Sequence, residues 1–317
     1  MNIKGLHHVT AIAGDPQRNL DFYAGVLGLR LVKRTVNFDD PGSYHFYFGD
    51  ATGTPGTILT FFPWPSARRG SRGIGEIEAT GFVIPPESTG YWLQRLQDHR
   101  LSVAPVSQRF GDEVIRFADP DGMIIELIAS RQAASGLHFS ESPDPEEHAI
   151  RGLHGVTAAL DQTESSARLL TDLFGYRLTV ESGNRARYSA PPSDSFGREI
   201  DLVTTPGVPR GRSGAGTVHH IAFRVATANE QLTWQEKIAN LGYGVSPVMD
   251  RTYFQSIYFR EPGGILFEIA TDLPGFITDE SEAELGSHLR LPAWMERSRA
   301  RIEAVLPAIT LPNEVKL

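Results

Sequence analysis

The chain has 317 residues, a formal net charge of −8 and no cysteine, and 21% of its residues are charged. This acidic balance, without a long basic run, argues against a nucleic-acid partner and against a polybasic membrane anchor. The lack of cysteine excludes disulfides, thiolate ligands and cysteine nucleophiles, so any metal must bind histidine, carboxylate or neutral oxygen donors. We see no signal peptide and no apolar run long enough to cross a bilayer, so we expect a cytoplasmic protein with no membrane partner.

Four related segments follow one another along the chain, at residues 6–62, 76–130, 153–204 and 217–271. The first resembles the third, and the second resembles the fourth. Each begins with an apolar run typical of a strand, continues with apolar residues at helical spacing, and ends with further strands. The second and fourth share a Pro-Asp/Gly-Gly turn between two apolar runs, which predicts a β-hairpin. The sequence therefore predicts four copies of one βαβββ module.

Length and composition indicate how these modules are grouped. The length suggests about two domains. We predict an N-terminal pair of modules at 1–135, a linker at 136–150, a C-terminal pair at 151–272 and a tail at 273–317. The linker is rich in serine, proline and acidic residues, as connections between folded units are. Apolar spacing over 295–306 predicts a C-terminal helix outside the repeats.

A doubled histidine occurs twice, at the start of the first module and at the start of the fourth. The pairs are His7 with His8 and His219 with His220, and a later apolar run contains Glu268. All three runs are predicted strands, which indicates two imidazoles and one carboxylate on converging strands. This facial triad suits non-haem Fe(II) and leaves open coordination positions, while Mn(II) and Zn(II) bind the same donors.

The alternation of side chains along a strand selects the ligands from these candidates. His8, His220 and Glu268 each fall on the less apolar face of their strand, which we expect to line the interior of a curved sheet. We therefore predict these three as the metal ligands. The first histidine of each pair, His7 or His219, then lies beside a ligand, where it can orient the ligand or handle protons.

The repeats supply an internal control on the number of metal sites. At the positions that match His8 and His220, the other two modules carry Gly155 and Ala79. Glu126 persists at the position that matches the ligand carboxylate. A second site would lack both imidazoles, so we predict one metal site per chain.

These motifs resemble the vicinal oxygen chelate superfamily, which includes glyoxalases and extradiol dioxygenases. More narrowly, the chain resembles the dioxygenases that cleave the ring of para-hydroquinones. The resemblance covers about residues 5–272 and implies an α+β fold of four βαβββ modules, paired into two cupped, barrel-like sheets with a C-terminal helical tail. It also implies that the first and fourth modules enclose the metal. The matching residues are 5–10, 32–41, 44–50, 218–223, Arg251, Tyr253, Phe254, 256–259 and Glu268.

The resemblance also implies an activity, which is O₂-dependent cleavage of a small hydroquinone-type ring, a step of aromatic compound degradation. Fe(II) is the expected metal, with Mn(II) as an alternative and O₂ as co-substrate. Five residues match catalytic and substrate-contacting positions of that family: His7, Thr10, His219, Arg251 and Tyr258. Tyr258 would hydrogen-bond the reacting oxygen, Arg251 would orient the remote hydroxyl, and His7 or His219 would act as general acid or base.

Two other functions fit the same pattern. A glyoxalase-like lyase or isomerase would use Zn(II), Ni(II) or Mn(II) to stabilise an enediolate and would need no O₂. A binding protein would hold an aromatic compound without converting it; some superfamily members do this, but they generally lack the triad, so the complete triad argues against this function. We also expect a homo-oligomer, in which the C-terminal helix either contacts the partner or caps its own pocket.

Overall fold

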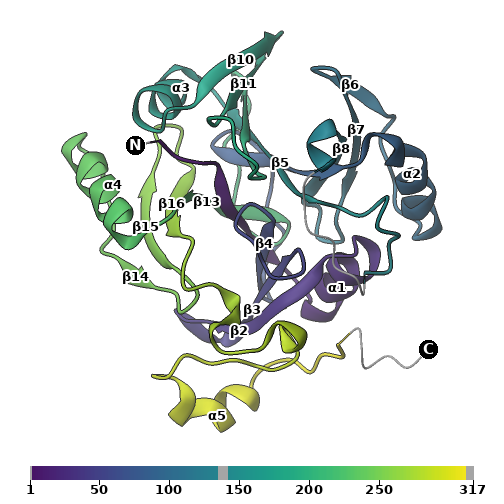
Figure 1. Cartoon of the computed structure of the whole chain (residues 1–317), viewed down its shortest axis with the longest axis vertical. Coiled ribbons are helices and arrows are strands. Elements are labelled where there is room, and N and C mark those ends of the chain that lie inside the picture. Colours follow the sequence, from purple (N-terminus) through teal and green to yellow (C-terminus); the bar gives the residue numbers. More distant parts are fainter. Residues whose placement is uncertain (1, 135–141, 312–317) are drawn as a thin grey trace.

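Two curved eight-stranded sheets form the body of the protein, whose computed structural model describes residues 2–134 and 142–311 (Figure 1). In spatial order the first sheet contains β14 (Met249–Asp250), β15 (Gln255–Arg260), β16 (Leu266–Thr271), β13 (Thr217–Val225), β1 (Leu6–Ala13), β4 (Ile58–Pro63), β3 (Asp40–Gly49) and β2 (Arg30–Asn37). The second contains β10 (Arg177–Ser182), β11 (Arg185–Ser189), β12 (Glu199–Thr204), β9 (Gly152–Leu160), β5 (Glu76–Ile84), β8 (Ile124–Ala129), β7 (Asp112–Ala118) and β6 (Ser107–Arg109).

Each sheet joins one module from the N-terminal half of the chain to one module from the C-terminal half. β1 of the first module pairs antiparallel with β13 of the fourth, and β5 of the second pairs antiparallel with β9 of the third. The predicted fold of four modules paired into two cupped sheets is therefore confirmed. The first and fourth modules share a sheet, as the resemblance implied. The segment boundaries at 135, 150 and 272 stay predictions, and part of the linker, residues 136–141, lies outside the described residues.

The helices follow the first strand of each module, as predicted. They are α1 (Pro16–Leu20) continued by η1 (Asp21–Val26), η2 (Pro86–Ser88) with α2 (Thr89–Asp98), α3 (Glu164–Arg168) continued by η4 (Leu169–Leu173), and α4 (Ala228–Asn240); a further short turn is η3 (Arg131–Ala134). The turn that follows η4 requires a positive φ of 78° at Gly175, a conformation that glycine adopts without strain.

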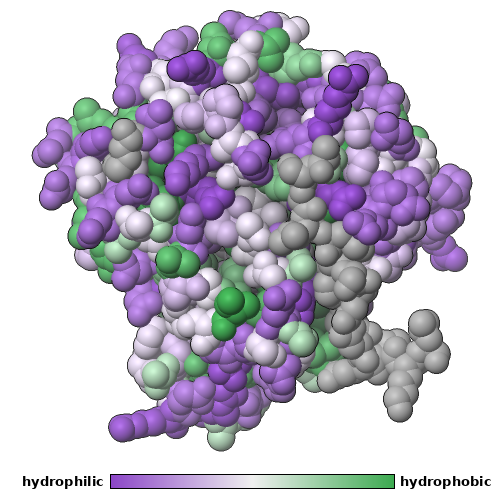
Figure 2. All heavy atoms as spheres, viewed as in Figure 1, coloured by the Kyte–Doolittle hydropathy of each residue, from purple (hydrophilic) through white to green (hydrophobic). Residues whose placement is uncertain are grey.

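The core lies between the helices and the convex faces of the sheets. One continuous cluster of buried apolar side chains spans both sheets. Trp92 of α2 and Trp234 of α4 are fully buried in it, at corresponding positions of the second and fourth modules. Hydrophilic residues cover much of the face shown in Figure 2. Within the described residues, no helix combines the length and apolar character needed to cross a bilayer.

The segment after β16 folds back along β2 and β3, at the bottom of Figure 1. It contains η5 (Phe276–Thr278), η6 (Glu282–Glu284), η7 (Glu296–Ser298) and α5 (Arg299–Glu303). Lys33 of β2 is fully buried and forms ion pairs with Asp279 and Glu280 of this tail. The helix predicted at 295–306 is present but shorter, because the tail turns at both of its flanks, near Pro292 and Pro307.

Candidate metal centre

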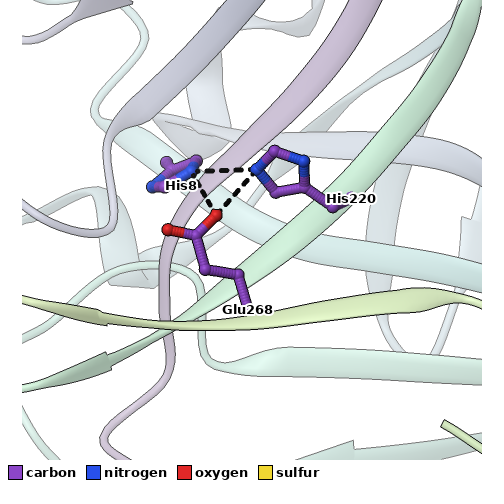
Figure 3. A group of neighbouring side chains, drawn as sticks. All are labelled: His8, His220 and Glu268. Atoms are coloured by element: carbon purple, nitrogen blue, oxygen red, sulfur yellow. Dashed lines mark hydrogen bonds and ion pairs between the residues drawn. The ribbon is translucent and has the colours of Figure 1, made fainter. Parts of the chain in front are cut away.

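Three adjacent strands of the first sheet, β1, β13 and β16, carry His8, His220 and Glu268. His8 Nε2 lies 3.4 Å from His220 Nε2 and 3.4 Å from Glu268 Oε2, and His220 Nε2 lies 2.8 Å from the same oxygen. Figure 3 shows the three side chains directed toward one another from separate strands. The structure thus brings together the three residues that strand alternation selected.

The donor atoms of this group suit a metal ion. Glu268 Oε2 is buried without a hydrogen-bond partner of suitable geometry, although two imidazole nitrogens lie near it. A buried carboxylate oxygen in this state is costly, and a cation among the three atoms would satisfy all of them. Metal–ligand bonds of about 2.1 Å at right angles place donor atoms about 3 Å apart. The separations between His8, His220 and Glu268 lie close to that value.

The protonation states also suit metal binding. Burial lowers the pKa of His220, which favours the neutral imidazole. Burial alone would raise the pKa of Glu268, but the neighbouring His8 and His220 hold it well below its ordinary value. Neutral imidazole and ionised carboxylate are the forms that donate electron pairs to a metal.

Both doubled histidines lie at β-bulges. The β1–β13 ladder has one extra residue on β1 directly before His8, which is His7, and one on β13 directly before His220, which is His219. A bulge redirects a side chain that regular alternation would send to the opposite face. His7 Nδ1 is 3.0 Å from His8 Nδ1, and His219 Nδ1 is 2.8 Å from His220 Nδ1. Each pair thus fixes the orientation of one candidate ligand ring and leaves its Nε2 for the metal.

A cavity of about 410 Å³ opens beside the three candidate ligands. Four of the five residues predicted as catalytic line it: Thr10, His219, Arg251 and Tyr258. His7 lies behind His8 instead, against the ring of Phe254, with its centroid 5.0 Å away. Burial lowers the pKa of His219 to about 4, and the adjacent His220 contributes to the shift.

Two polar contacts organise the wall next to Glu268. Ser256 donates a hydrogen bond of 2.5 Å to Glu268 Oε1. Tyr258 pairs directly with Glu268 across β15 and β16, so both side chains share the face that lines the cavity. Arg251 Nε donates to the Tyr258 hydroxyl at 3.2 Å, and its Nη1 lies 3.4 Å from Asp39. Burial and the charge of Glu268 raise the pKa of Tyr258, so its hydroxyl stays protonated.

Several residues that line the cavity were given no catalytic role from the sequence, although some of them lie in the runs that resemble the family. His45 and Tyr47 of β3 face it, together with the aromatic rings of Phe38, Phe62, Trp64 and Phe254. The run 44–48 is aromatic or histidine at every position, so its two faces could not be told apart by alternation. The signal that could have indicated a functional role for this strand was the histidine within a run of aromatic residues.

The second sheet repeats the geometry without the ligands. Glu126 takes the place of Glu268, but two arginines, Arg109 and Arg116, donate hydrogen bonds to its carboxylate at 2.6–2.8 Å. Burial alone would raise the pKa of Glu126, but the hydrogen bonds and the charge of Arg109 bring it below its ordinary value. The two guanidinium groups therefore neutralise the charge of this carboxylate, which needs no metal ion. Within residues 2–134 and 142–311, His8, His220 and Glu268 form the one cluster of three or more potential metal ligands.

Comparison with known proteins assigns the family. A sequence profile of the Glyoxalase/Bleomycin resistance protein/Dioxygenase superfamily matches residues 5–127 and 152–269. The chain belongs to this superfamily. It is 48% identical to "Putative ring-cleaving dioxygenase MhqO" of Bacillus subtilis (strain 168), over 98% of this chain and 97% of the relative. It is 35% identical to a chlorohydroquinone/hydroquinone 1,2-dioxygenase of Sphingobium indicum, over 93% of both chains.

Solved structures agree with the fold. A crystal structure of a Bacillus subtilis protein, 45% identical, superposes with a TM-score of 0.93 and covers 98% of both chains. Glyoxalase I of maize superposes with a TM-score of 0.62 at 14% identity, over 84% of this chain and 92% of the other. At that level of identity the likeness concerns the fold alone.

Proposed function

We propose that this protein is a metal-dependent ring-cleaving dioxygenase that acts on a hydroquinone-type aromatic ring. The observation that carries the proposal is the convergence of His8, His220 and Glu268 at the wall of a cavity with aromatic sides. The names of its relatives support the same activity, because they include ring-cleaving dioxygenases and one that acts on chlorohydroquinone and hydroquinone.

Fe(II) is the metal that we propose, with Mn(II) as the alternative. Two neutral imidazoles and one carboxylate would hold it and leave positions free for other ligands. When bound, Fe(II) would acidify the phenolic hydroxyl of the substrate and mediate electron transfer from the ring to O₂. The chain's own residues then have to bind the ring, exclude water and manage its protons.

The aromatic residues at the cavity wall would hold the flat ring of the substrate. Phe254 packs against His8 with a centroid separation of 5.1 Å, and Phe62 and Trp64 stack on one another at 5.6 Å. Such rings bury the faces of an aromatic ligand and favour offset or edge-on contacts with it. A small aromatic substrate is therefore the proposed partner.

Three polar side chains would orient the substrate and move its proton. Because the Tyr258 hydroxyl accepts a hydrogen bond from Arg251, its own proton is available to a substrate oxygen. Arg251 also faces the cavity and could bind the remote hydroxyl of the ring. His219 lines the cavity, so we assign it the role of proton acceptor, while His7 holds the ring of His8.

We propose a cytoplasmic homo-oligomer, and light scattering on the purified protein would measure its molar mass. A mass equal to that of one chain would contradict the oligomer.

Oxygen consumption tests the proposed function. Protein loaded with Fe(II) without air would be mixed with hydroquinone, its methyl and chloro derivatives, and catechol in an oxygen-electrode cell. We expect O₂ uptake in proportion to an added hydroquinone, and no uptake with His8→Ala. If iron-loaded protein consumes no O₂ with any of these compounds, the proposal fails and oxygen-independent lyase chemistry becomes the next function to test.

A further inference from the structure

A chain of hydrogen bonds leads from β3 to the residue next to the metal group. The Tyr47 hydroxyl lies 2.9 Å from His45 Nδ1, His45 Nε2 lies 2.9 Å from Thr60 Oγ1, and Thr60 donates to Thr10 Oγ1 at 2.9 Å. Thr10 pairs with His220 across β1 and β13. Tyr47, Thr60 and Thr10 are at most 1% exposed, so water does not compete for these bonds.

The direction of the bonds follows from proton counting. A hydroxyl has one proton, and that of Thr60 is used toward Thr10. Thr60 Oγ1 must therefore accept from His45, which places the imidazole proton on Nε2. His45 Nδ1 is then an acceptor for the Tyr47 proton. Burial lowers the pKa of His45 and raises that of Tyr47, so both groups hold the neutral forms that this direction needs.

The chain ends with a free donor at the cavity. Thr10 Oγ1 accepts from Thr60, and its own proton has no acceptor among residues 2–134 and 142–311. Thr10 lines the same cavity as His8, His220 and Glu268. A buried hydroxyl with an unused proton at this place is suited to a ligand that brings an oxygen acceptor.

The second sheet indicates that the fold does not require this chain. Thr157 occupies the position of Thr10, and its neighbour on the adjacent parallel strand is Asp201 in place of Thr60. Arg185 donates to both Thr157 and Asp201, so the same position is filled by an ion-pair cluster. The uncharged relay is therefore specific to the sheet that carries the candidate metal ligands.

We propose that Tyr47, His45 and Thr60 orient the Thr10 hydroxyl so that it donates a hydrogen bond to the phenolic oxygen of the ligand in the metal cavity. His45 is thus a positioning residue that acts through Thr10. The inference rests on the proposed function, because it takes a phenolic compound as the ligand. A hydrogen bond to an anionic phenolic oxygen is worth about tenfold or more in affinity.

The test measures the binding of p-cresol, which has one hydroxyl and is not a hydroquinone, to metal-loaded protein without O₂. We expect Thr10→Val to weaken binding about tenfold or more, and Thr10→Ser, which keeps the donor, to restore it. His45→Phe keeps the ring contacts with Tyr47 and Phe62 but removes both nitrogens, so we expect a comparable loss. The double variant of Thr10 and His45 should bind no more weakly than Thr10→Val alone.

Three results would overturn the inference. They are additive losses in the double variant, unchanged binding in folded, metal-loaded His45→Phe, or no binding of p-cresol to the original protein. If His45→Phe fails to fold, Tyr47→Phe tests the same chain by removing its first donor. Thr157→Val is the matched control in the second sheet and should leave p-cresol binding unchanged. Because p-cresol binding needs no turnover, its outcome is separate from that of the O₂ uptake experiment.

Discussion

Replacement of Ser256 by alanine is predicted to weaken metal binding while the fold stays intact. Ser256 is fully buried, and it donates a hydrogen bond of 2.5 Å to the fully buried carboxylate of Glu268. A hydrogen bond to a charged group contributes about 1.5–3 kcal/mol, which corresponds to about 10- to 100-fold in affinity. Loss of a partner that orients a metal ligand reduces metal affinity by about the same factor. Both estimates therefore predict 10- to 100-fold weaker binding.

Metal affinity can be measured by titrating Mn(II), which is stable in air, in competition with a fluorescent chelator. Ser166→Ala is a matched control, because Ser166 donates an equally short hydrogen bond of 2.5 Å to Glu261. Both of these residues are 3% exposed, and neither belongs to the candidate metal site. We expect similar losses of unfolding free energy in the two metal-free variants, but weaker Mn(II) binding in Ser256→Ala alone. If Ser256→Ala binds Mn(II) with an affinity within twofold of that of the original protein, the hydrogen bond does not support metal binding.

Four further predictions concern the two sheets and the tail. Glu268→Gln should abolish O₂ uptake and metal binding, because a neutral amide replaces the anionic ligand; retention of both would remove this residue from the site. Glu126→Gln should lower the unfolding free energy in urea by about 1.5–3 kcal/mol and leave O₂ uptake unchanged, since two partly buried arginines, Arg109 and Arg116, lose this carboxylate as a partner. The lowered pKa of Glu126 means that its ion pairs stabilise the fold fully above the ordinary value of 4.5, and that this contribution is lost as the pH falls further. The original protein should thus lose more stability below pH 4.5 than Glu126→Gln does, and parallel pH profiles would contradict this. Lys33→Met should expose the tail to limited proteolysis, because two carboxylates lose their buried ammonium partner; an unchanged cleavage pattern would show that the tail is held by other contacts.

Strand alternation selected His8, His220 and Glu268 from the sequence, because from His8 to Ala13, from His220 to Val225 and along β16 the chain alternates without interruption. Alternation could not predict that His219 lines the cavity while His7 lies behind His8. Each is the extra residue of a β-bulge, and a bulge is defined by the pairing with another strand, which periodicity within one strand does not record.

His45 belongs to a run that resembles the family, but it received no role from the sequence for a different reason. The strand around it has aromatic residues on both faces, one set in the core and the other at the cavity, so no amphipathic pattern marked the functional face. The C-terminal helix was predicted over 295–306 from apolar spacing, but its α-helical part is limited to Arg299–Glu303. Arg299 forms ion pairs with Glu296 and Glu303 there, which support this short helix, while the turns near Pro292 and Pro307 bound it.

A single-turnover reaction with ¹⁸O₂ tests ring cleavage most directly. Iron-loaded protein would react with one equivalent of hydroquinone, and mass spectrometry would count the labelled oxygens in the product. We predict that one O₂ is consumed for each ring and that the ring-opened product contains both labelled atoms. Formation of benzoquinone without incorporated label, or release of unchanged hydroquinone, would contradict it.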